Sequence, residues 1–272
     1  MPELPEVETT RRGISPHLSG ILVREVIVRR RDLRQPVPED LVEITGRKIL
    51  AVRRRAKYLL LDIADGSTVL IHLGMSGSLR MVPAAEAWKK HDHVGITMAT
   101  GLQARFHDPR RFGLVLHFSL TDPLEHPLLR DLGPEPLGKD FTTAVLATAC
   151  ASSSRAVKLV IMDNHVVVGV GNIYASEALF RAGIHPLAAA CTLSRQRLDR
   201  LAGAIRTVLG DAITSGGTTL RDFLNSDGKP GYFAQHLDVY DRQGEPCHRC
   251  GRTIRHAVLG QRATFWCPRC QR

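Results

Sequence analysis

Four cysteines near the end of the sequence constrain the fold more than any other feature of this 272-residue chain. They occur as Cys247-His-Arg-Cys250 and Cys267-Pro-Arg-Cys270, two Cys-x2-Cys pairs separated by sixteen residues. Two residues between cysteines let both thiolates of a tight turn face one ion, and two such turns complete a tetrahedron. The alternative is a pair of disulfides, although a reducing cytoplasm keeps thiols free. The pattern therefore predicts one structural Zn²⁺ with four protein ligands and no open position for a catalytic water.

The charge of the chain indicates a polyanionic partner. Lysine and arginine number 37 against 27 for aspartate and glutamate, which gives a formal net charge of +10. Seven arginines and two acids fall in residues 241–272, and residues 47–57 hold six basic residues and no acid. A basic excess suits either nucleic acid or an anionic membrane surface. A cysteine module this basic is expected to lie on phosphate, and the alternative is that it only stabilises the fold.

The sequence gives no indication of a membrane span or an export signal. No apolar run approaches the roughly 18–20 residues that a spanning helix needs. The N-terminus carries acids and prolines where a signal peptide has a basic start and an apolar stretch. A hydrophobic fraction of 43% is enough to fill ordinary globular cores. We therefore expect a soluble cytoplasmic protein outside the membrane, and the absence of heptads favours a monomer.

The first half of the chain is predicted to be rich in β-strands. One short helix from Glu6 to Arg12 is expected first, ending near Gly13. Alternating apolar residues and turn residues then predict strands over residues 21–28, 58–63, 68–73, 94–98, 102–106 and 113–118. Several short strands with regular turns indicate a sandwich or a barrel.

The character of the sequence changes at residues 131–138, where two prolines and two glycines indicate a linker. Helix-type spacing follows over residues 144–151, 156–162, 173–182 and 194–212, with Ser194 as an expected N-cap. A polar stretch containing glycines, residues 216–231, then precedes the cysteine module. The length therefore divides into a β domain, a helical domain and a small metal module.

The N-terminus carries a chemical possibility besides a helix start. Removal of the initiator methionine would expose the secondary amine of Pro2, which is a nucleophile toward an aldehyde carbon. An α-amino group titrates near pH ~8, against ~10.4 for lysine, so more of it is unprotonated at neutral pH. Its adduct with a carbonyl stays a cationic iminium, and Glu3 and Glu6 follow closely. From these residues alone, an ordinary helix start remains the simpler interpretation.

The opening Met1-Pro-Glu-Leu-Pro-Glu6 resembles the start of the formamidopyrimidine-DNA glycosylase family, which are 8-oxoguanine DNA glycosylases and AP lyases. The resemblance continues in order through Arg54-Arg-Ala-Lys57, His72-Leu-Gly-Met75, Lys90-His91-Asp-His93, Asp108-Pro-Arg110-Arg-Phe112, Gly169-Val-Gly-Asn172, Asp227-Gly-Lys-Pro-Gly and Gln261-Arg262. It implies an α+β multidomain fold. The expected parts are an N-terminal β-sandwich with flanking helices over residues 1–132, a helix–two-turn–helix domain with a lesion-capping loop over 133–235, and a zinc ribbon over 236–272.

The resemblance implies base-excision repair of duplex DNA, in which oxidised purines (8-oxoguanine and formamidopyrimidines) are removed and the strand is cut by β- and δ-elimination. Pro2 would be the nucleophile at sugar C1′, forming a Schiff base, and Glu3 would protonate the ring oxygen. Lys57 would donate a proton on the phosphate side of the first elimination. Arg262 would take the corresponding position in the second elimination. It would act there as a cationic clamp, because the pKa of a guanidinium group is too high for a proton donor. Glu6 is expected near the damaged base, and the alternative is a first-turn acid that complements the helix dipole.

A base inside a duplex must be extruded before excision, and the hole that it leaves must be filled. The resemblance assigns this filling to Met75, Arg110 and Phe112. Phe112 would act as an apolar wedge and Arg110 would pair with the orphaned cytosine. Without the resemblance, Met75 and Phe112 would be interpreted as ordinary core residues.

Phosphate contacts are expected from His91, Lys158 and Asn172, the last at a helix N-terminus. The glycine turn before Asn172 lacks the lysine and the serine or threonine of a phosphate P-loop. Some members of the family carry more lysines where this chain has three serines, so Arg155 is expected to substitute for a contact there. A purely structural histidine is the alternative for His91.

The stretch from Thr218 to Tyr232 resembles a loop that closes over the flipped base. Its amides and hydroxyls are expected to read the edge of the oxidised purine. The lesion pocket would then contain Glu6, Thr218, Thr219, Arg221 and Tyr232.

Two other functions stay open at this stage. An endonuclease VIII-like glycosylase would prefer oxidised pyrimidines, but Leu4 in the opening motif and the Asp108-Pro-Arg-Arg-Phe112 wedge favour the purine class. A non-enzymatic zinc-ribbon protein that binds DNA would explain the charge. It gives no reason for Pro2 next to Glu3, or for the three void-filling residues together.

Overall fold

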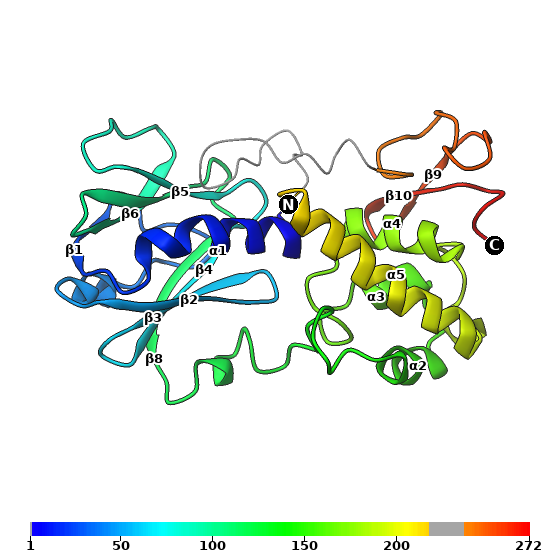
Figure 1. Cartoon of the computed structure of the whole chain (residues 1–272), viewed down its shortest axis with the longest axis horizontal. Coiled ribbons are helices and arrows are strands. Elements are labelled where there is room, and N and C mark those ends of the chain that lie inside the picture. The colour runs from blue at the N-terminus through cyan, green and yellow to red at the C-terminus, as the bar shows by residue number, and fades with distance from the viewer. Residues whose placement is uncertain (1, 218–236) are drawn as a thin grey trace. The chain divides into compact units, whose positions relative to one another are not determined.

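The computed structural model describes residues 2–217 and 237–272 of the chain (Figure 1). Contacts between residues separate the chain into two compact units. Of the described part, the first unit holds residues 2–130 and 215–217, and the second holds residues 131–214 and 237–272. The helical segment and the cysteine module therefore share one unit.

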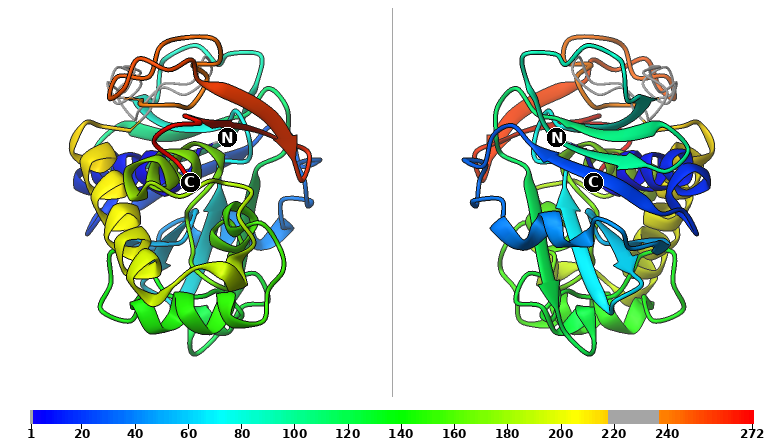
Figure 2. Two further views of the ribbon diagram at one scale, coloured as in Figure 1. Left: turned by 90° about the vertical axis from the view of Figure 1, so that its right-hand side faces the viewer. Right: turned by 90° about the vertical axis from the view of Figure 1, so that its left-hand side faces the viewer.

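The first unit is built on two four-stranded antiparallel sheets, with strand orders β1-β6-β7-β5 and β2-β3-β4-β8 (Figure 2, right). The strands are β1 (Val23–Val28), β2 (Ile49–Arg55), β3 (Tyr58–Ile63), β4 (Ser67–His72), β5 (Ser78–Pro83), β6 (Asp92–Met98), β7 (Leu102–His107) and β8 (Leu114–Ser119). Inward-facing residues of both sheets, such as Leu59 and Val69 from one and Ile96 and Phe106 from the other, join a single hydrophobic core. This is the β-sandwich that the sequence led us to expect. Two short 3-10 helices, η1 (Glu39–Ile44) and η2 (Pro123–Glu125), complete the unit.

Helix α1 (Leu4–Leu18) contacts β2 from one sheet and β5 from the other (Figure 1). The prediction that this helix ends near Gly13 is wrong, because the helix continues through Gly13 and Pro16 to Leu18. Ile14 and Leu18 are completely buried in the sandwich core. Burial of such a side chain contributes ~1.5–3 kcal/mol, which exceeds the ~1 kcal/mol cost of a glycine inside a helix.

Each strand expected from alternation is present within two residues of its expected bounds. Strands β2 and β5 were not expected. In β5 four of the six residues are buried, including polar Ser78 and Arg80, so burial does not follow the polar and apolar character of its residues.

The second unit contains the helices α2 (Thr143–Ala151), α3 (Val157–Ile161), α4 (Asn172–Ala182) and α5 (Arg195–Thr214), with the short 3-10 helix η3 (Ala190–Thr192) (Figure 2, left). All four α-helices lie within two residues of their expected bounds. The Ser194 hydroxyl accepts a hydrogen bond from the Arg197 N–H at 3.4 Å, as an N-cap does. A hairpin of β9 (Arg255–Leu259) and β10 (Arg262–Trp266) follows.

The cysteine module is packed on α4, which explains why both belong to one unit. Phe180 of α4 joins Val239, Ile254 and Phe265 in one small apolar core. The buried Glu177 carboxylate accepts three backbone N–H groups, from residues 238, 239 and 240, at 2.8–3.0 Å. Among the described residues, no helix is both long and apolar enough to span a membrane.

Candidate active site and zinc centre

The start of α1 carries three residues that the sequence assigned to chemistry. Pro2, Glu3 and Glu6 are all buried. The Glu6 Oε2 atom accepts the backbone N–H of Glu3 at 2.8 Å, which is half of a capping box. Glu6 therefore does stabilise the helix start. Its other oxygen faces Gly217, where a Cβ atom would lie 3.2 Å from Oε1 and the backbone is left-handed (φ +83°). The described chain therefore enters the predicted lesion-capping segment directly beside Glu6.

Lys57 lies in the two-residue turn between β2 and β3 and is only 8% exposed. The preceding residue, Ala56, has a positive φ of 52°, a conformation that costs a non-glycine residue roughly 1 kcal/mol or more. The Arg54 Nη1 atom donates to the Ala56 carbonyl at 2.9 Å and holds this turn. The backbone from which the Lys57 side chain extends is thus held in place.

Glu8 connects this turn to α1. Its carboxylate accepts hydrogen bonds from Arg11, Arg12 and Arg54 at 2.8–3.2 Å, and the Glu8 side chain is 11% exposed. Burial alone would raise the pKa of Glu8, but the three arginines outweigh it and lower the pKa to about 2. Arg54 therefore links α1, the helix that directly follows Pro2 and Glu3, to the turn that carries Lys57.

His72, at the end of β4, belongs to the same neighbourhood and was not singled out from the sequence. Its ring contacts that of Tyr58 with centroids 5.0 Å apart. Burial, and then the charges of Lys57 and Arg34, lower its pKa to about 4. The ring is neutral at pH 7, and its Nδ1 accepts the Gly74 N–H at 3.0 Å, so the proton lies on Nε2. Its position in the His72-Leu-Gly-Met75 motif was the available signal.

Two loops that carry the expected void-filling residues are held against each other. A Cβ atom on Gly74 would lie 2.5 Å from the Gly113 nitrogen, so the Met75 loop and the Phe112 loop meet backbone to backbone. The buried Asp108 carboxylate fixes the second loop by accepting the Gly113 N–H at 2.8 Å and the Arg110 N–H at 3.3 Å.

Phe112 is 46% exposed, which is unlike a core phenylalanine. The Arg110 guanidinium lies over its ring, 5.0 Å from the centroid. Met75 is half-buried. The structure thus brings the three residues together on two rigidly joined loops and leaves the ring of Phe112 accessible.

His91 lies on a histidine-rich edge of the first unit, with its ring 6.3 Å from that of His93 and 6.0 Å from that of His107. The neighbouring Asp92 is buried and accepts a hydrogen bond from Arg80 at 3.0 Å. Its carboxylate also lies 2.8 Å from Nδ1 of His107. The buried carboxylate of Asp92 therefore holds the segment that carries His91 in place.

The basic run at residues 47–57 is more engaged within the protein than its sequence indicated. Arg53 binds Asp62 of the adjacent strand through two hydrogen bonds of 2.5 and 2.6 Å. Arg54 binds Glu8, and Arg47 lies 3.8 Å from Asp65. Acids outside this run, on α1, on β3 and in the turn after β3, therefore neutralise part of its charge.

In the second unit, two predicted phosphate ligands hold the hairpin in place. Lys158 is fully buried, and its Nζ donates to Thr264 Oγ1 at 2.9 Å and to the Ala263 carbonyl at 3.2 Å. The Asn172 Nδ2 donates to the same carbonyl at 2.9 Å. Asn172 is the first residue of α4, after Gly171, as the glycine turn indicated.

Arg262 begins β10 directly after the Gly260–Gln261 turn, in which both residues have positive φ. It is exposed, and the contacts of Lys158 and Asn172 to the next two residues fix its backbone. Arg155 is committed elsewhere, because its Nη1 lies 3.2 Å from the Asp163 carboxylate. That ion pair weakens the expectation that Arg155 replaces a lysine as a phosphate ligand.

The four cysteines meet the geometric requirement of the predicted zinc site. All four Sγ atoms lie within 4.8 Å of one another. The Cys250–Cys267 and Cys247–Cys270 pairs are 3.4 and 3.9 Å apart. A tetrahedral ion with Zn–S bonds of ~2.3 Å places its sulfurs about 3.8 Å apart. Within residues 2–217 and 237–272, no other group of three or more His, Cys, Asp or Glu residues has this arrangement. The four thiolates hold one structural Zn²⁺.

The remaining members of the predicted lesion pocket lie outside the described residues. They are Thr218, Thr219, Arg221 and Tyr232.

Comparison with known proteins agrees with these observations. Residues 1–115 match the formamidopyrimidine-DNA glycosylase N-terminal domain, residues 132–224 its H2TH domain, and residues 244–272 the zinc finger found in FPG and IleRS. The chain is 57% identical to a formamidopyrimidine-DNA glycosylase of Stenotrophomonas maltophilia and 58% identical to one of Pseudomonas aeruginosa, over the full length of each.

Solved structures are similar as well. The Fpg protein of Thermus thermophilus superposes with a TM-score of 0.89 at 40% identity, covering 99% of this chain and 98% of that one. A complex of Lactococcus lactis Fpg with DNA containing an abasic site gives 0.92 at 32% identity, covering 99% of each chain. A complex of the same enzyme with DNA containing Fapy-dG gives 0.91, covering 99% of this chain and all of that one. The chain belongs to the formamidopyrimidine-DNA glycosylase family.

Proposed function

We propose that this protein excises oxidised purines from duplex DNA and then cuts the strand by β- and δ-elimination. The observation that carries the proposal is the buried Pro2-Glu3 pair at the capped start of α1, in a chain of this family. The Lactococcus lactis relative was crystallised with DNA that contains Fapy-dG or an abasic site, which supports oxidised purines as substrates here. The full-length relatives carry the name of the purine-directed class, which favours it over an endonuclease VIII-like specificity.

The reaction begins when the amine of Pro2, freed by removal of Met1, attacks C1′ of the damaged nucleotide. The glycosidic bond breaks and the base leaves. Glu3 protonates the ring oxygen as the sugar opens, and the product is a cationic iminium joining Pro2 to C1′. The iminium withdraws electrons, so the adjacent C2′ loses a proton and the 3′-phosphate departs. A second elimination releases the 5′-phosphate.

The leaving phosphates need positive charge and hydrogen-bond donors. We assign the first phosphate to Lys57, which is held in its turn by Arg54. The neighbouring His72 is neutral at pH 7 and offers only its Nε2–H. The second phosphate is assigned to Arg262, at the tip of the β9–β10 hairpin, as a clamp of fixed charge.

Extrusion of the damaged base leaves a gap, and the joined loops offer the groups to fill it. Phe112 is an exposed apolar ring of the kind that unstacks a base step. Arg110 lies over that ring and would pair with the orphaned cytosine. Met75 would complete the filling from the other loop. His91 and Asn172 stay proposed phosphate contacts. The assignment is weaker for Lys158, which is fully buried and donates to Ala263 and Thr264, and for Arg155, which pairs with Asp163.

The proposal also covers the lesion pocket, the domain bounds, the place of action and the oligomeric state. Thr218, Thr219, Arg221 and Tyr232 would line the lesion pocket together with Glu6. The domain bounds 1–132, 133–235 and 236–272 are retained as functional divisions. The protein is proposed to act on chromosomal DNA in the cytoplasm, as a monomer and without a membrane partner.

Borohydride trapping tests the proposal. The mature protein is incubated with duplexes that carry 8-oxoguanine opposite cytosine, or thymine glycol, and borohydride reduces any iminium to a stable covalent complex. We expect trapping with the 8-oxoguanine duplex. Trapping only with thymine glycol would indicate the pyrimidine class, and no trapping with either would leave a non-enzymatic DNA-binding protein. Pro2→Gly, or a retained N-terminal tag, should strongly reduce trapping, and normal strand cleavage by a tagged protein would refute the role of Pro2.

A further inference from the structure

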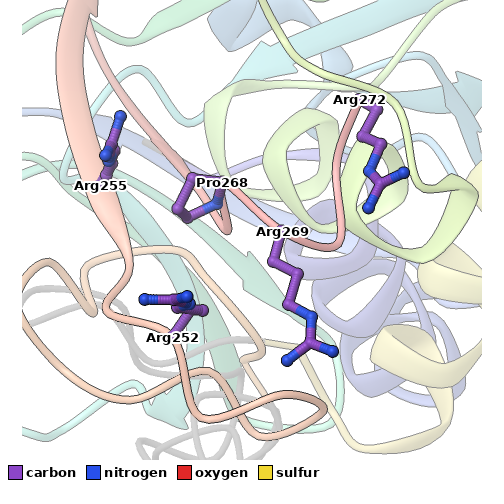
Figure 3. A pocket seen from close by; sticks show the side chains of 5 residues that line it. All are labelled: Arg252, Arg255, Pro268, Arg269 and Arg272. Carbon is purple, nitrogen blue, oxygen red and sulfur yellow. The ribbon is translucent and has the colours of Figure 1, made fainter.

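A hollow ringed by arginines lies in the cysteine module, apart from the residues assigned above (Figure 3). It has a volume of about 410 Å³ and is lined by Arg252, Arg255, Pro268, Arg269 and Arg272. The arginines come from separate segments, namely the turn after the first cysteine pair, strand β9, the second cysteine pair and the residues that follow it. All four are exposed. Four arginines from different segments thus line one concave surface.

The four arginines that line the hollow have no acidic side chain as a partner among the described residues. No ion pair found among residues 2–217 and 237–272 involves Arg252, Arg255, Arg269 or Arg272, and no acid lines the hollow. Two acids of the preceding segment have partners elsewhere. Glu245 binds Arg242 at 2.8 Å, and Asp238 lies 3.8 Å from His248.

The zinc centre accounts for only part of this charge. A Zn²⁺ ion with four thiolates has a net charge of minus two. Residues 246–272 contain six arginines and no acid, so the module stays strongly positive after the thiolates are counted. Arg249 is already placed over the Phe180 ring, 4.3 Å from its centroid. Counter-charge for the metal therefore does not explain four arginines that line one hollow.

The hollow is separate from the proposed position of Arg262. In the hairpin register Arg262 pairs with Leu259 at the turn, whereas Arg255 pairs with Trp266 at the opposite end. Four residues of strand at ~3.3 Å each separate the two ends by about 13 Å. A phosphate held by Arg262 and one held in the hollow would therefore be different phosphates.

We propose that this hollow is a second phosphate-binding site, which takes backbone phosphates of a nucleic acid. A guanidinium group can bind two oxygens of one phosphate, and it keeps its positive charge at every physiological pH. About 410 Å³ is many times the ~30 Å³ that a water molecule occupies, so the hollow has room for more than one phosphate group. It is open and lacks the buried donors that would enclose a small anion. A free polyphosphate shares the same chemistry, and the test separates the two sources.

The proposal rests on the proposed function only for the identity of DNA as the partner. Binding of undamaged DNA requires no excision chemistry. Trapping by the wild-type protein therefore tests the proposed function, whereas the salt dependence of undamaged-duplex binding tests the hollow, and either can fail alone.

The test uses the zinc-loaded full-length protein and the variant Arg252→Gln/Arg269→Gln. Fluorescence anisotropy with an undamaged 30-base-pair duplex gives Kd from 50 to 200 mM salt. Each lost phosphate contact lowers the slope of log K against log salt by ~0.9, so we expect the slope to fall by about 1.8. Between 50 and 200 mM salt, the factor by which the variant loses affinity should then be about 12 times smaller than the factor for the wild type. Calorimetry with inorganic pyrophosphate forms the second arm.

The matched control is Arg24→Gln/Arg200→Gln, which removes two exposed arginines elsewhere on the chain. Arg252→Lys/Arg269→Lys keeps the charge and should restore most of the slope. An unchanged slope with loss of pyrophosphate binding would keep the phosphate site and overturn nucleic acid as its source. The proposal is overturned if neither arm responds. It is also overturned if the control lowers the slope equally, or if the Gln variant loses zinc and binds DNA normally once zinc is restored.

Discussion

Glu8 provides the sharpest test of how the first unit holds its site. Its carboxylate binds three arginines, and its pKa is lowered from 4.5 to about 2. A difference of about 2.5 pKa units corresponds to roughly 3 kcal/mol of folding free energy at neutral pH. Glu8→Gln keeps an acceptor oxygen but loses the charge. We therefore expect it to lower the free energy of unfolding by about 2–3 kcal/mol at pH 7.

The pH dependence gives the sign of the effect. Because the folded-state pKa of Glu8 is below its unfolded value, the unfolded chain binds the proton first as the pH falls. The stabilisation is complete above pH 4.5 and is lost as the pH approaches 2. The wild type and Glu8→Gln should therefore differ fully at pH 7 and converge at acid pH.

The two units need separate readouts, because a chain of two compact units does not unfold as one step. The two tryptophans, Trp88 and Trp266, fall one in each unit. In a Trp266→Phe background, urea unfolding followed by Trp88 fluorescence reports on the first unit alone. Glu43→Gln, an exposed acid on η1, is the control and should change stability by less than ~0.5 kcal/mol. An equal Glu8→Gln penalty at pH 7 and pH 3, or none at pH 7, would refute the ion-pair argument.

Three further changes follow from the structure. Removing zinc with a chelator should abolish duplex binding, because two ligands, Cys247 and Cys267, are part of the apolar core beneath the hairpin. Metal analysis with a parallel anisotropy measurement checks this. Full binding by the zinc-free protein would contradict it. Phe112→Ala should leave the melting temperature nearly unchanged, since the ring is exposed. It should weaken binding to 8-oxoguanine duplex by about 5- to 150-fold, because loss of a stacking wedge costs ~1–3 kcal/mol; a large loss of stability would show a core role instead. Glu177→Gln leaves at least one of three backbone N–H groups without its acceptor, at a cost of about 1–3 kcal/mol. Hydrogen exchange of residues 238–240 should accelerate, and unchanged protection would argue against this anchor.

Local patterns predicted much of the fold. The cysteine spacing predicted the zinc site because both ligand pairs lie in tight turns, where sequence separation controls distance. The helices of the second unit were predicted within two residues because their apolar spacing agrees with the faces that they bury. Strand β5 was missed because its polar and apolar residues alternate only over residues 78–81, and because Arg80 and Ser78 are buried where polar residues are expected to be exposed.

The site was predictable only in part. Pro2, Glu3 and Lys57 are recognisable from motifs, but the links between their segments are not. The contact of Glu8 with Arg54 joins residues 46 positions apart. His72 is neutral because it is buried beside Lys57, which follows from the pairing of β3 with β4. Such contacts depend on register and packing, and no short stretch of sequence encodes them.

By itself the sequence determined the zinc ligands, the order of the elements and the residue types that the chemistry requires, because each depends on near neighbours in the chain. Only the tertiary structure decided which charges are available to a partner. Arg53 and Arg155 are paired with acids from other segments, Lys158 is buried beneath the hairpin, and the arginines around the hollow have no acid beside them. The physical reason is that nearby opposite charges cancel much of the field that a charge presents to a partner. Folding decides which opposite charges lie nearby.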